Sequence, residues 1–194
     1  MDFGGGGMKS QYEQRILETK RRIYGAFLRL MRDRSIHQIS ISELCQLAGI
    51  NRSTFYHHFG SQYDVLAELT DAFLEDLEAQ LLDVSPRDQA GVQRRVEMCL
   101  DNAMRNKELT LLLMRSSEGT QFALRLFSLP KIENLLHESL ADVPSEAERR
   151  ARIDFVTYGA YRLLQQWLTA PAPISTQEET ALILKLARCV CSEK

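Results

Sequence analysis

Six polar side chains that can hydrogen-bond to nucleic acid follow one another closely after residue 51. They are Arg52, Ser53, Thr54, Tyr56, His57 and His58. A guanidinium such as that of Arg52 can donate two hydrogen bonds to O6 and N7 of a guanine, and hydroxyls can donate to phosphate oxygens. Phe55 and Phe59 are four residues apart and therefore share one side of a helix. The stretch predicts a short helix with an apolar side toward a core and a polar side suited to the major groove of DNA.

A second helix is predicted directly before this one, at residues 40–48. Ser40 and Glu43 have the spacing of a capping box, in which the hydroxyl accepts from a free amide and the carboxylate reaches back. Three apolar residues at helical spacing are expected to bury one face of this helix: Leu44, Leu47 and Ala48. Gly49 can take the left-handed geometry of a helix exit, and Asn51 can cap the helix that follows. Many all-α proteins contain such a two-helix turn, so the polar residues carry the DNA-binding interpretation.

The run AGINRSTFYHHF, from Ala48 to Phe59, resembles the recognition segment of the TetR-type (TetR/AcrR) transcriptional regulators. In that family a pattern of Gly-apolar-Ser-x-x-Thr-aromatic-Tyr-x-x-Phe recurs. The preceding Ile41-x-x-Leu44 and the following Ser61-x-x-x-Val65-Leu66 also fall at the spacing of the family. The likeness covers the stretch from Thr19 to Leu69, and beyond it the similarity is one of architecture.

The resemblance implies which side chains contact DNA. Tyr56 and His58 correspond to positions that pack over the DNA backbone, and the first helix brings Lys20 and Arg21 near the phosphates. Gln62 stands where the family usually has a lysine that meets a phosphate, so this contact lacks a charge and the salt dependence of binding is expected to be lower. The predicted DNA-binding residues are Ser40, Asn51, Arg52, Ser53, Thr54, Tyr56, His57, His58, Gln62, Lys20 and Arg21.

Several of these residues have alternative interpretations. Arg52 can contact a base, contact a phosphate or stay in solvent, and a solvated face accounts equally well for most cations of the first helix. The His57–His58 pair does not predict a metal site, because neighbouring residues diverge on a helix and no third ligand is placed nearby. The sequence therefore predicts no metal and no cofactor.

The composition indicates an all-α protein. The chain has 194 residues, of which 44% are hydrophobic, and long amphipathic runs with few Pro and Gly dominate it. Its net charge of −2 does not by itself suggest nucleic acid, but residues 1–70 are mildly basic and the remainder is acidic. No apolar run approaches the roughly 20 residues of a membrane span, and the N-terminus lacks the apolar region of a signal peptide. We expect a cytoplasmic protein with its four cysteines as free thiols.

The chain is expected to form two functional domains with about nine helices. Residues 1–10, which include four consecutive glycines, are predicted to be a disordered extension. Residues 11–60 are predicted to form a three-helix DNA-binding domain, with a first helix from Gln11 to Arg34. Residues 61–194 are predicted to form a helical domain for ligand binding and dimerisation. Within it, Ser85-Pro86 is expected to start one helix, and Pro130 to kink or break another.

The last two predicted helices indicate a homodimer. The helix from Ser145 to about Thr169 is apolar around more than one face, so it is expected to face both its own core and a partner. The end of the chain, with a proline turn and an amphipathic last helix, resembles that of many TetR-type proteins, in which two such helices from each subunit form a four-helix bundle. The predicted interface residues are Tyr161, Leu164, Trp167, Leu168, Leu182 and Leu186.

The larger domain also contains Met and aromatic residues that are suited to line a pocket for a mostly apolar small molecule. Each of them can equally belong to ordinary core packing. The candidates are Phe73, Met98, Met104, Met114, Phe122, Phe127, Tyr158 and Tyr161.

Together these observations lead to one functional hypothesis and two alternatives. The hypothesis is a TetR-like repressor that a small ligand releases from a palindromic operator by changing the separation of two DNA-binding heads. The first alternative is a DNA-binding regulator of the same fold without a small-molecule inducer, controlled by a protein partner or acting as an activator. The second is an enzyme, which is disfavoured because the sequence has no phosphate-binding glycine loop, no metal-ligand spacing and no nucleophile with an evident base.

Overall fold

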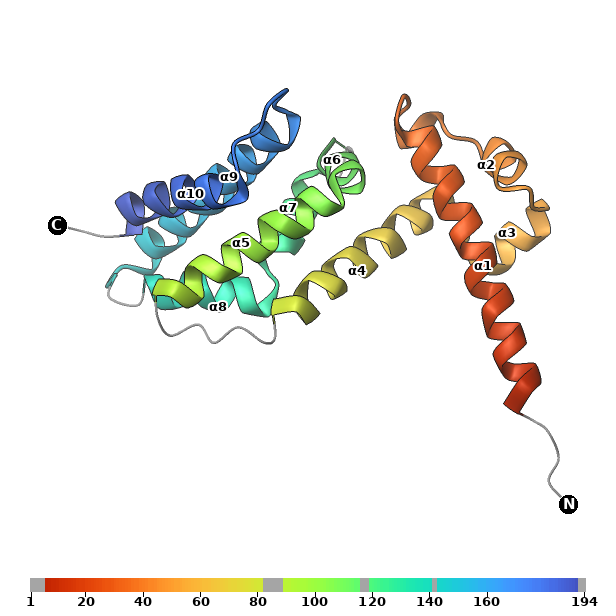
Figure 1. The fold of residues 1–194 in the computed structure, drawn as a ribbon, viewed down its shortest axis with the longest axis horizontal. Helices are drawn as coiled ribbons and strands as arrows, with labels where there is room; N and C mark the ends of the chain where they lie inside the picture. Colours follow the sequence, from red (N-terminus) through yellow and green to blue (C-terminus); the bar gives the residue numbers. More distant parts are fainter. Residues whose placement is uncertain (1–5, 82–88, 116–118, 141–142, 192–194) are drawn as a thin grey trace, which may run out of the picture. The chain divides into compact units, whose positions relative to one another are not determined.

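The computed structural model describes residues 6–81, 89–115, 119–140 and 143–191, and in these ranges the chain is all-helical (Figure 1). The described residues form ten α-helices and one 3₁₀ helix, η1. Their order is α1 (Gly6–Met31), η1 (Ile36–Gln38), α2 (Ile41–Ala48), α3 (Arg52–His58), α4 (Gln62–Leu81), α5 (Gln89–Arg105), α6 (Lys107–Arg115), α7 (Gly119–Phe127), α8 (Pro130–Ser139), α9 (Glu146–Thr169) and α10 (Thr176–Cys191). The chain divides into two compact units, Met1–Asp71 and Ala72–Lys194, called unit 1 and unit 2 below.

Unit 1 is built around the long helix α1, with α2 and α3 packed along one side of it (Figure 1). Its core consists of apolar side chains from each of these elements: Ile23, Phe27, Ile36, Ile39, Leu44, Phe55, Phe59, Val65 and Leu66. Phe55 and Phe59 are both buried, as their spacing predicted, and their rings lie 5.8 Å apart between centroids. The first half of α4 closes this core.

Helix α1 differs from its predicted limits at both ends. It begins at Gly6, so residues 6–10 belong to a helix although the sequence predicted disorder there. The apolar stripe of this helix does not extend into these residues, and no periodicity marked them. The helix ends at Met31 rather than Arg34, because the chain must turn to bury Ile36 of η1. The remainder of the predicted extension, residues 1–5, lies outside the described residues.

Unit 2 contains α5 to α10 and the second half of α4. Helix α5 packs against α10, and α10 lies beside α9 (Figure 1). The predicted break at Pro130 is confirmed: α7 ends at Phe127, and α8 begins with this proline in its first turn, where the missing amide costs nothing. The break makes two helices from one predicted helix, which explains why ten are found instead of about nine. The predicted start of a helix at Ser85-Pro86 lies outside the described residues.

The last two helices begin near the predicted residues. Ser175 and Glu178 form a capping box, since the Glu178 amide donates to Ser175 Oγ at 3.2 Å and the Ser175 amide donates to the carboxylate at 2.9 Å. At the start of α9 only half of the predicted box is present. The Glu148 amide donates to Ser145 Oγ at 3.3 Å, but the Glu148 carboxylate pairs with Arg152 instead of the Ser145 backbone.

An apolar surface lies on the outside of α9 and α10. Phe155 is 69% exposed there, and Tyr158, Leu182 and Leu186 are also exposed. The two helices therefore have more apolar surface than their own unit covers, as the sequence of α9 predicted. Trp167 and Leu168, which were predicted at a subunit interface, are instead buried within the single chain. None of the helices that the structure describes is both long and apolar enough to cross a membrane.

Candidate nucleic-acid interface

Helix α2 is fixed at its start by the predicted capping box. The Glu43 amide donates to Ser40 Oγ at 3.2 Å, and the Ser40 amide donates to the Glu43 carboxylate at 3.4 Å. Arg34 also donates to this carboxylate, at 2.8 Å, and this bond together with those from Ser40 lowers the pKa of Glu43. Ser40 therefore has a capping role that its position in the sequence predicted.

The buried face of α2 is rotated relative to the prediction. Leu44, Cys45 and Ala48 are buried, whereas Leu47 is 41% exposed. A helix advances about 100° per residue, so a buried face centred near Ala48 takes in Leu44 and Cys45 on its two sides and leaves Leu47 outside it. The prediction that Leu47 is buried was wrong.

The turn between α2 and α3 depends on Gly49. This residue has φ +63° and ψ +41°, and the Ile50 amide donates to the Cys45 carbonyl at 3.0 Å, as in a Schellman motif. Arg22 of α1 donates from Nη2 to the Gly49 carbonyl, which fixes the turn to α1. The left-handed backbone favours glycine here, and a Cβ atom at position 49 would lie 2.5 Å from this nitrogen, so the guanidinium would have to shift and its bond to the turn would be disturbed.

Helix α3 presents most of the predicted polar residues to the outside. Arg52, Ser53, Tyr56 and His57 are exposed, with 54% of Tyr56 accessible, while Phe55 lies beneath them in the core. These side chains thus occupy one accessible face of a helix that is fixed by its apolar side, which is the arrangement needed to enter a groove of DNA.

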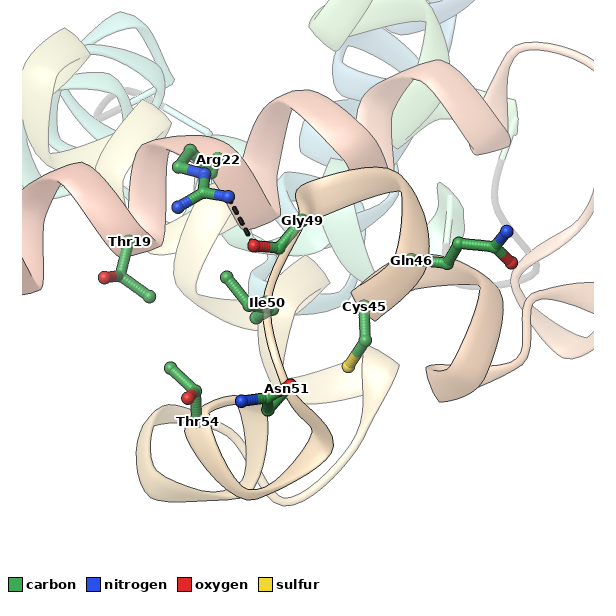
Figure 2. A pocket seen from close by; sticks show the side chains of 8 residues that line it. All are labelled: Thr19, Arg22, Cys45, Gln46, Gly49, Ile50, Asn51 and Thr54. Carbon is green, nitrogen blue, oxygen red and sulfur yellow. Dashed lines mark hydrogen bonds between the residues drawn. The ribbon is translucent and has the colours of Figure 1, made fainter.

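Asn51 stands at the N-cap position of α3 with extended backbone, but its side chain makes no capping hydrogen bond. The predicted cap is therefore absent. The side chain lines a polar pocket of about 390 Å³ between α1, the turn and α3. Figure 2 shows Thr19 and Arg22 on the α1 side of this pocket and Asn51 and Thr54 on the α3 side. The pocket gives Thr54, which is half-buried, a different environment from its exposed neighbours.

Lys20 is engaged within unit 1. Its ammonium contacts both carboxylate oxygens of Glu68 on α4, at 2.6 and 2.9 Å, and lies 5.4 Å from the centroid of the Phe59 ring. Tyr24 also donates to Glu68. Burial alone would raise the pKa of Glu68, but the bonds from Lys20 and Tyr24 lower it overall. Lys20 therefore ties α1 to α4 and is not a free cation for a phosphate, while Arg21 beside it is exposed.

The remaining predicted residues lie near the junction of α3 and α4. His58 is half-buried, and burial lowers its pKa, with the charges of His57 and Lys20 acting in the same direction and that of Glu68 opposing them. Gln62 is half-buried at the first turn of α4. One hydrogen bond in this region was not predicted from the sequence. His37 Nδ1 lies 2.6 Å from the hydroxyl oxygen of Tyr63, and both side chains are exposed. No local signal marked it, because the two residues are far apart in the chain.

Unit 2 contains a largely apolar cavity of about 170 Å³. Of the predicted pocket residues, only Phe127 and Tyr161 line it among the described residues. Phe73, Phe122 and Met114 are core residues, and Tyr158 is exposed. Met98 and Met104 are half-buried away from the cavity. The prediction therefore selected large side chains, whereas the cavity is lined mainly by Leu, Ile, Val and Ala.

Residues 23–69 match the family described as bacterial regulatory proteins of the tetR family. This segment contains the C-terminal part of α1, the helix-turn-helix and the first part of α4. The chain belongs to the TetR family. TetR-family proteins are DNA-binding transcriptional regulators and not enzymes, so the predicted family, the all-α fold and the non-enzymatic character are confirmed.

Two relatives support this assignment. The TetR-family chain is 24% identical over 190 residues to the HTH-type transcriptional regulator AcrR of Shigella flexneri. The aligned region covers 89% of this chain and 88% of AcrR. It is 30% identical over 139 residues to DhaS of Lactococcus lactis subsp. lactis (strain IL1403), an HTH-type transcriptional activator of the dhaKLM operon, covering 67% of this chain and 65% of DhaS.

The fold of this TetR-family chain is also that of a solved structure. A TetR transcriptional regulator from Streptococcus agalactiae 2603V superposes with a TM-score of 0.71 at 23% identity, covering 92% of this chain and 98% of that protein. The likeness therefore includes unit 2 as well as the DNA-binding segment.

Among the described residues no group of three or more His, Cys, Asp or Glu side chains is arranged to hold a metal ion. The four cysteines are free thiols.

Proposed function

We propose that this chain is a homodimeric repressor that a small, mostly apolar ligand releases from a palindromic operator. The observation that carries the ligand response is the cavity of unit 2, which is lined by residues of α5, α7, α8, α9 and α10 and by Leu81 of α4. A cavity bounded by so many helices is a suitable place for a small molecule, because apolar walls remove most of the ligand's surface from water.

The apolar surface of α9 and α10 supports the dimer. Phe155, Tyr158, Leu182 and Leu186 are exposed on these helices, and an apolar groove of about 480 Å³ runs between them. A contiguous apolar patch of this kind is the usual sign of a protein interface. A two-fold dimer would supply two copies of α3 for two half-sites one helical turn apart. Trp167 and Leu168 are not part of this proposed interface, because they are buried.

In this proposal residues 11–60 bind DNA, and residues 61–194 bind the ligand and form the dimer. Helix α4 would connect the two activities. Its Glu68 is bonded to Lys20 and Tyr24 of α1, and its last residue, Leu81, lines the cavity. A ligand that displaces the end of α4 would therefore act on a helix that is tied to α1 of the DNA-binding domain, which is a coupling between two sites through one shared element.

The test combines DNA binding with a cavity-filling variant. Fragments from around the protein's own gene are screened for retardation by the purified chain, and small apolar molecules are then tested for release of the retarded fragment. Val96→Phe fills the cavity from α5 and is expected to retain DNA binding but to lose release. Leu124→Phe, an exposed position on α7 outside the cavity, is the matched control. Release that persists unchanged in Val96→Phe would contradict the proposal.

One observation favours an alternative, in which the chain is an activator or responds to a protein partner. DhaS, the relative with 30% identity, is described as an activator. A reporter gene placed behind the bound fragment separates the two functions, since deletion of a repressor raises expression and deletion of an activator lowers it.

A further inference from the structure

The polar pocket of unit 1 lies between α1, the turn after α2 and the start of α3 (Figure 2). Its wall has one cation, Arg22, together with hydroxyl and amide side chains, and no acidic residue is among the described residues that line it. The lining residues are Thr19, Arg22, Cys45, Gln46, Gly49, Ile50, Asn51 and Thr54. One positive charge beside neutral hydrogen-bonding groups is a composition that favours an anion.

The charge of Arg22 is not neutralised within the described part of the chain. This exposed side chain donates from Nη2 to the carbonyl of Gly49, and it pairs with no carboxylate of the described residues. A carbonyl accepts a hydrogen bond without cancelling the charge, and a guanidinium has five N–H donors, so most of them remain available. Arg22 therefore differs from Lys20, whose ammonium pairs with Glu68. The bond to Gly49 also holds the guanidinium at the wall of the pocket.

Two neutral side chains stand across the pocket from Arg22. Asn51 makes no capping hydrogen bond and Thr54 is half-buried, and neither side chain has a hydrogen-bond partner among the described residues. Figure 2 shows both on the α3 side, opposite Arg22 on α1. Thr19 differs from them, because its hydroxyl already donates to the Arg15 carbonyl at 2.8 Å. Arg22, Asn51 and Thr54 therefore supply the available donors of the pocket.

The pocket borders the face of α3 that is expected to read DNA. Asn51 directly precedes Arg52 and Ser53, which are both exposed. A helix in the major groove has backbone phosphates beside it, and contacts to these phosphates fix its register on the duplex. Pockets of about 300–1,000 Å³ hold small molecules, so a pocket of about 390 Å³ has room for a phosphate together with its attached sugars.

From these observations we propose that the pocket holds one phosphate of the DNA backbone, with Arg22 supplying the charge and Asn51 and Thr54 supplying neutral hydrogen bonds. The inference rests on the DNA binding of the proposed function and not on its ligand response. It adds Arg22 as a DNA contact, and it gives the Asn51 side chain a partner other than the helix that it fails to cap.

The first experiment measures binding of the full chain to a short duplex of mixed sequence across a series of salt concentrations. Sequence-independent binding comes from phosphate contacts, and each contact adds about one to the slope of log affinity against log salt. Arg22→Gln is expected to lower this slope by about one, and Arg22→Lys, which keeps the charge, to retain it. Arg150→Gln makes the same charge change at an exposed site in unit 2 and is the matched control. An unchanged slope in Arg22→Gln would overturn the proposal.

A second experiment asks whether the three side chains hold the same phosphate. Thr54→Val keeps the branched shape but removes the hydroxyl, and it is expected to weaken DNA binding about two- to tenfold. Combined with Arg22→Gln, it should cost less than the two separate losses together, because residues that share one partner are not additive. Fully additive losses would place Arg22 and Thr54 on different phosphates and overturn the single site.

Arg22 also fixes the turn, so folding is checked by circular dichroism. If Arg22→Gln does not fold, Thr54→Val and Asn51→Ala decide the outcome, because neither removes a side-chain hydrogen bond made within the described residues. Wild-type DNA binding by both variants would overturn the proposal.

Free phosphate is the other source of the same anion, and calorimetry with inorganic phosphate in the absence of DNA distinguishes it. Binding of inorganic phosphate that Arg22→Gln abolishes, with an unchanged salt slope for DNA, would assign the pocket to the free ion and contradict the proposal. The outcomes also separate this inference from the proposed function. Absence of DNA binding at every salt concentration would contradict both, whereas DNA binding with an unchanged slope in Arg22→Gln would contradict the inference alone.

Discussion

The two units of the chain are stabilised in different ways. In unit 1, polar contacts of fixed geometry hold the helices: Arg22 bonds the Gly49 carbonyl, and Lys20 bonds Glu68 across 48 positions of sequence. In unit 2, apolar helices pack around a cavity of about 170 Å³, and the outer face of α9 and α10 stays exposed. Unit 1 thus holds one surface in place, while unit 2 leaves a cavity that its own side chains do not fill.

This difference agrees with the tasks proposed for the two units. Reading base edges needs side chains held in register with the groove, so the helix that carries them must be fixed by its neighbours. Responding to a ligand needs a site that is not already filled by the chain's own side chains. The native packing density of protein interiors leaves few voids larger than a water molecule, so a larger cavity is a feature of the fold to be explained.

The largest expected effect comes from matched truncations in the two cores. Phe55→Ala removes a fully buried ring from unit 1 and is expected to lower the free energy of unfolding by about 3–5 kcal/mol. Phe127→Ala in unit 2 is expected to cost less, because Phe127 is half-buried and borders the cavity. Urea denaturation followed by circular dichroism measures both. If Phe55→Ala and Phe127→Ala lose the same unfolding free energy, the contrast between a filled core in unit 1 and a cavity-containing core in unit 2 is contradicted.

Glycine substitutions test the turn of unit 1 next. Gly49→Ala is expected to cost at least about 1–2 kcal/mol, because a left-handed φ is strained for alanine and the new Cβ meets Arg22. Gly25→Ala on α1 is the control: its Cβ would have no neighbour within 4 Å, and alanine favours a helix, so a gain of up to about 1 kcal/mol is expected. Thermal unfolding should show a lower melting temperature for Gly49→Ala and a higher one for Gly25→Ala. An unchanged melting temperature for Gly49→Ala would contradict the role of this glycine in the turn.

The bond between α1 and α4 is expected to contribute less. Lys20→Met should destabilise unit 1 by about 1 kcal/mol or less, since both side chains are partly exposed and solvent screens the pair. Hydrogen exchange measured by mass spectrometry locates the effect. The exchange rate should increase in α1 and in the first half of α4. The fluorescence of Trp167, the single tryptophan of the chain, should show that unit 2 is unchanged. Arg29→Met, an exposed site on α1, is the control.

The smallest expected effect is a dependence of unit 1 on pH. Burial lowers the pKa of His58 below its ordinary value of 6.5, so the unfolded chain takes up this proton more readily than the folded chain. The stability that His58 contributes is present above pH 6.5 and is lost as the pH falls below it. His58→Gln should flatten the fall in unfolding free energy between about pH 7.5 and 5.5. Equal slopes in the wild type and His58→Gln would contradict the assignment.

The two units also differ in how much of them the sequence could predict. In unit 1 the signals are local: the Ser40–Glu43 box, the glycine at position 49 and the Phe55–Phe59 spacing each act over a few residues, and all three are confirmed. The Asn51 cap, also a local prediction, is absent. Two other predictions failed because a local pattern does not contain the packing around it. Lys20 was predicted at DNA because its partner Glu68 follows 48 positions later, and Leu47 was predicted in the core because spacing alone does not fix the centre of a buried face.

In unit 2 the sequence predicted helices but not their surroundings. The break at Pro130 and the exposed apolar face of α9 follow from residue type and periodicity. The burial of Trp167 could not be predicted in this way, because it depends on a contact made after a turn. The indole of Trp167 donates to the carbonyl of Ile174, which follows a proline-containing turn. The lining of the cavity was also missed, since cavities are bounded by whichever aliphatic side chains converge from several helices, and no single residue type marks them.

The account depends most on the claim that α3 reads DNA with its exposed face, and Arg52 tests it most directly. Binding to a specifically retarded fragment is measured for the wild type, Arg52→Ala and the exposed control Arg29→Ala across a series of salt concentrations. The account predicts that Arg52→Ala weakens specific binding by about 1–3 kcal/mol, which is roughly 5- to 150-fold, while Arg29→Ala stays close to the wild type. Specific binding that is equally strong in Arg52→Ala would show that another surface reads the DNA.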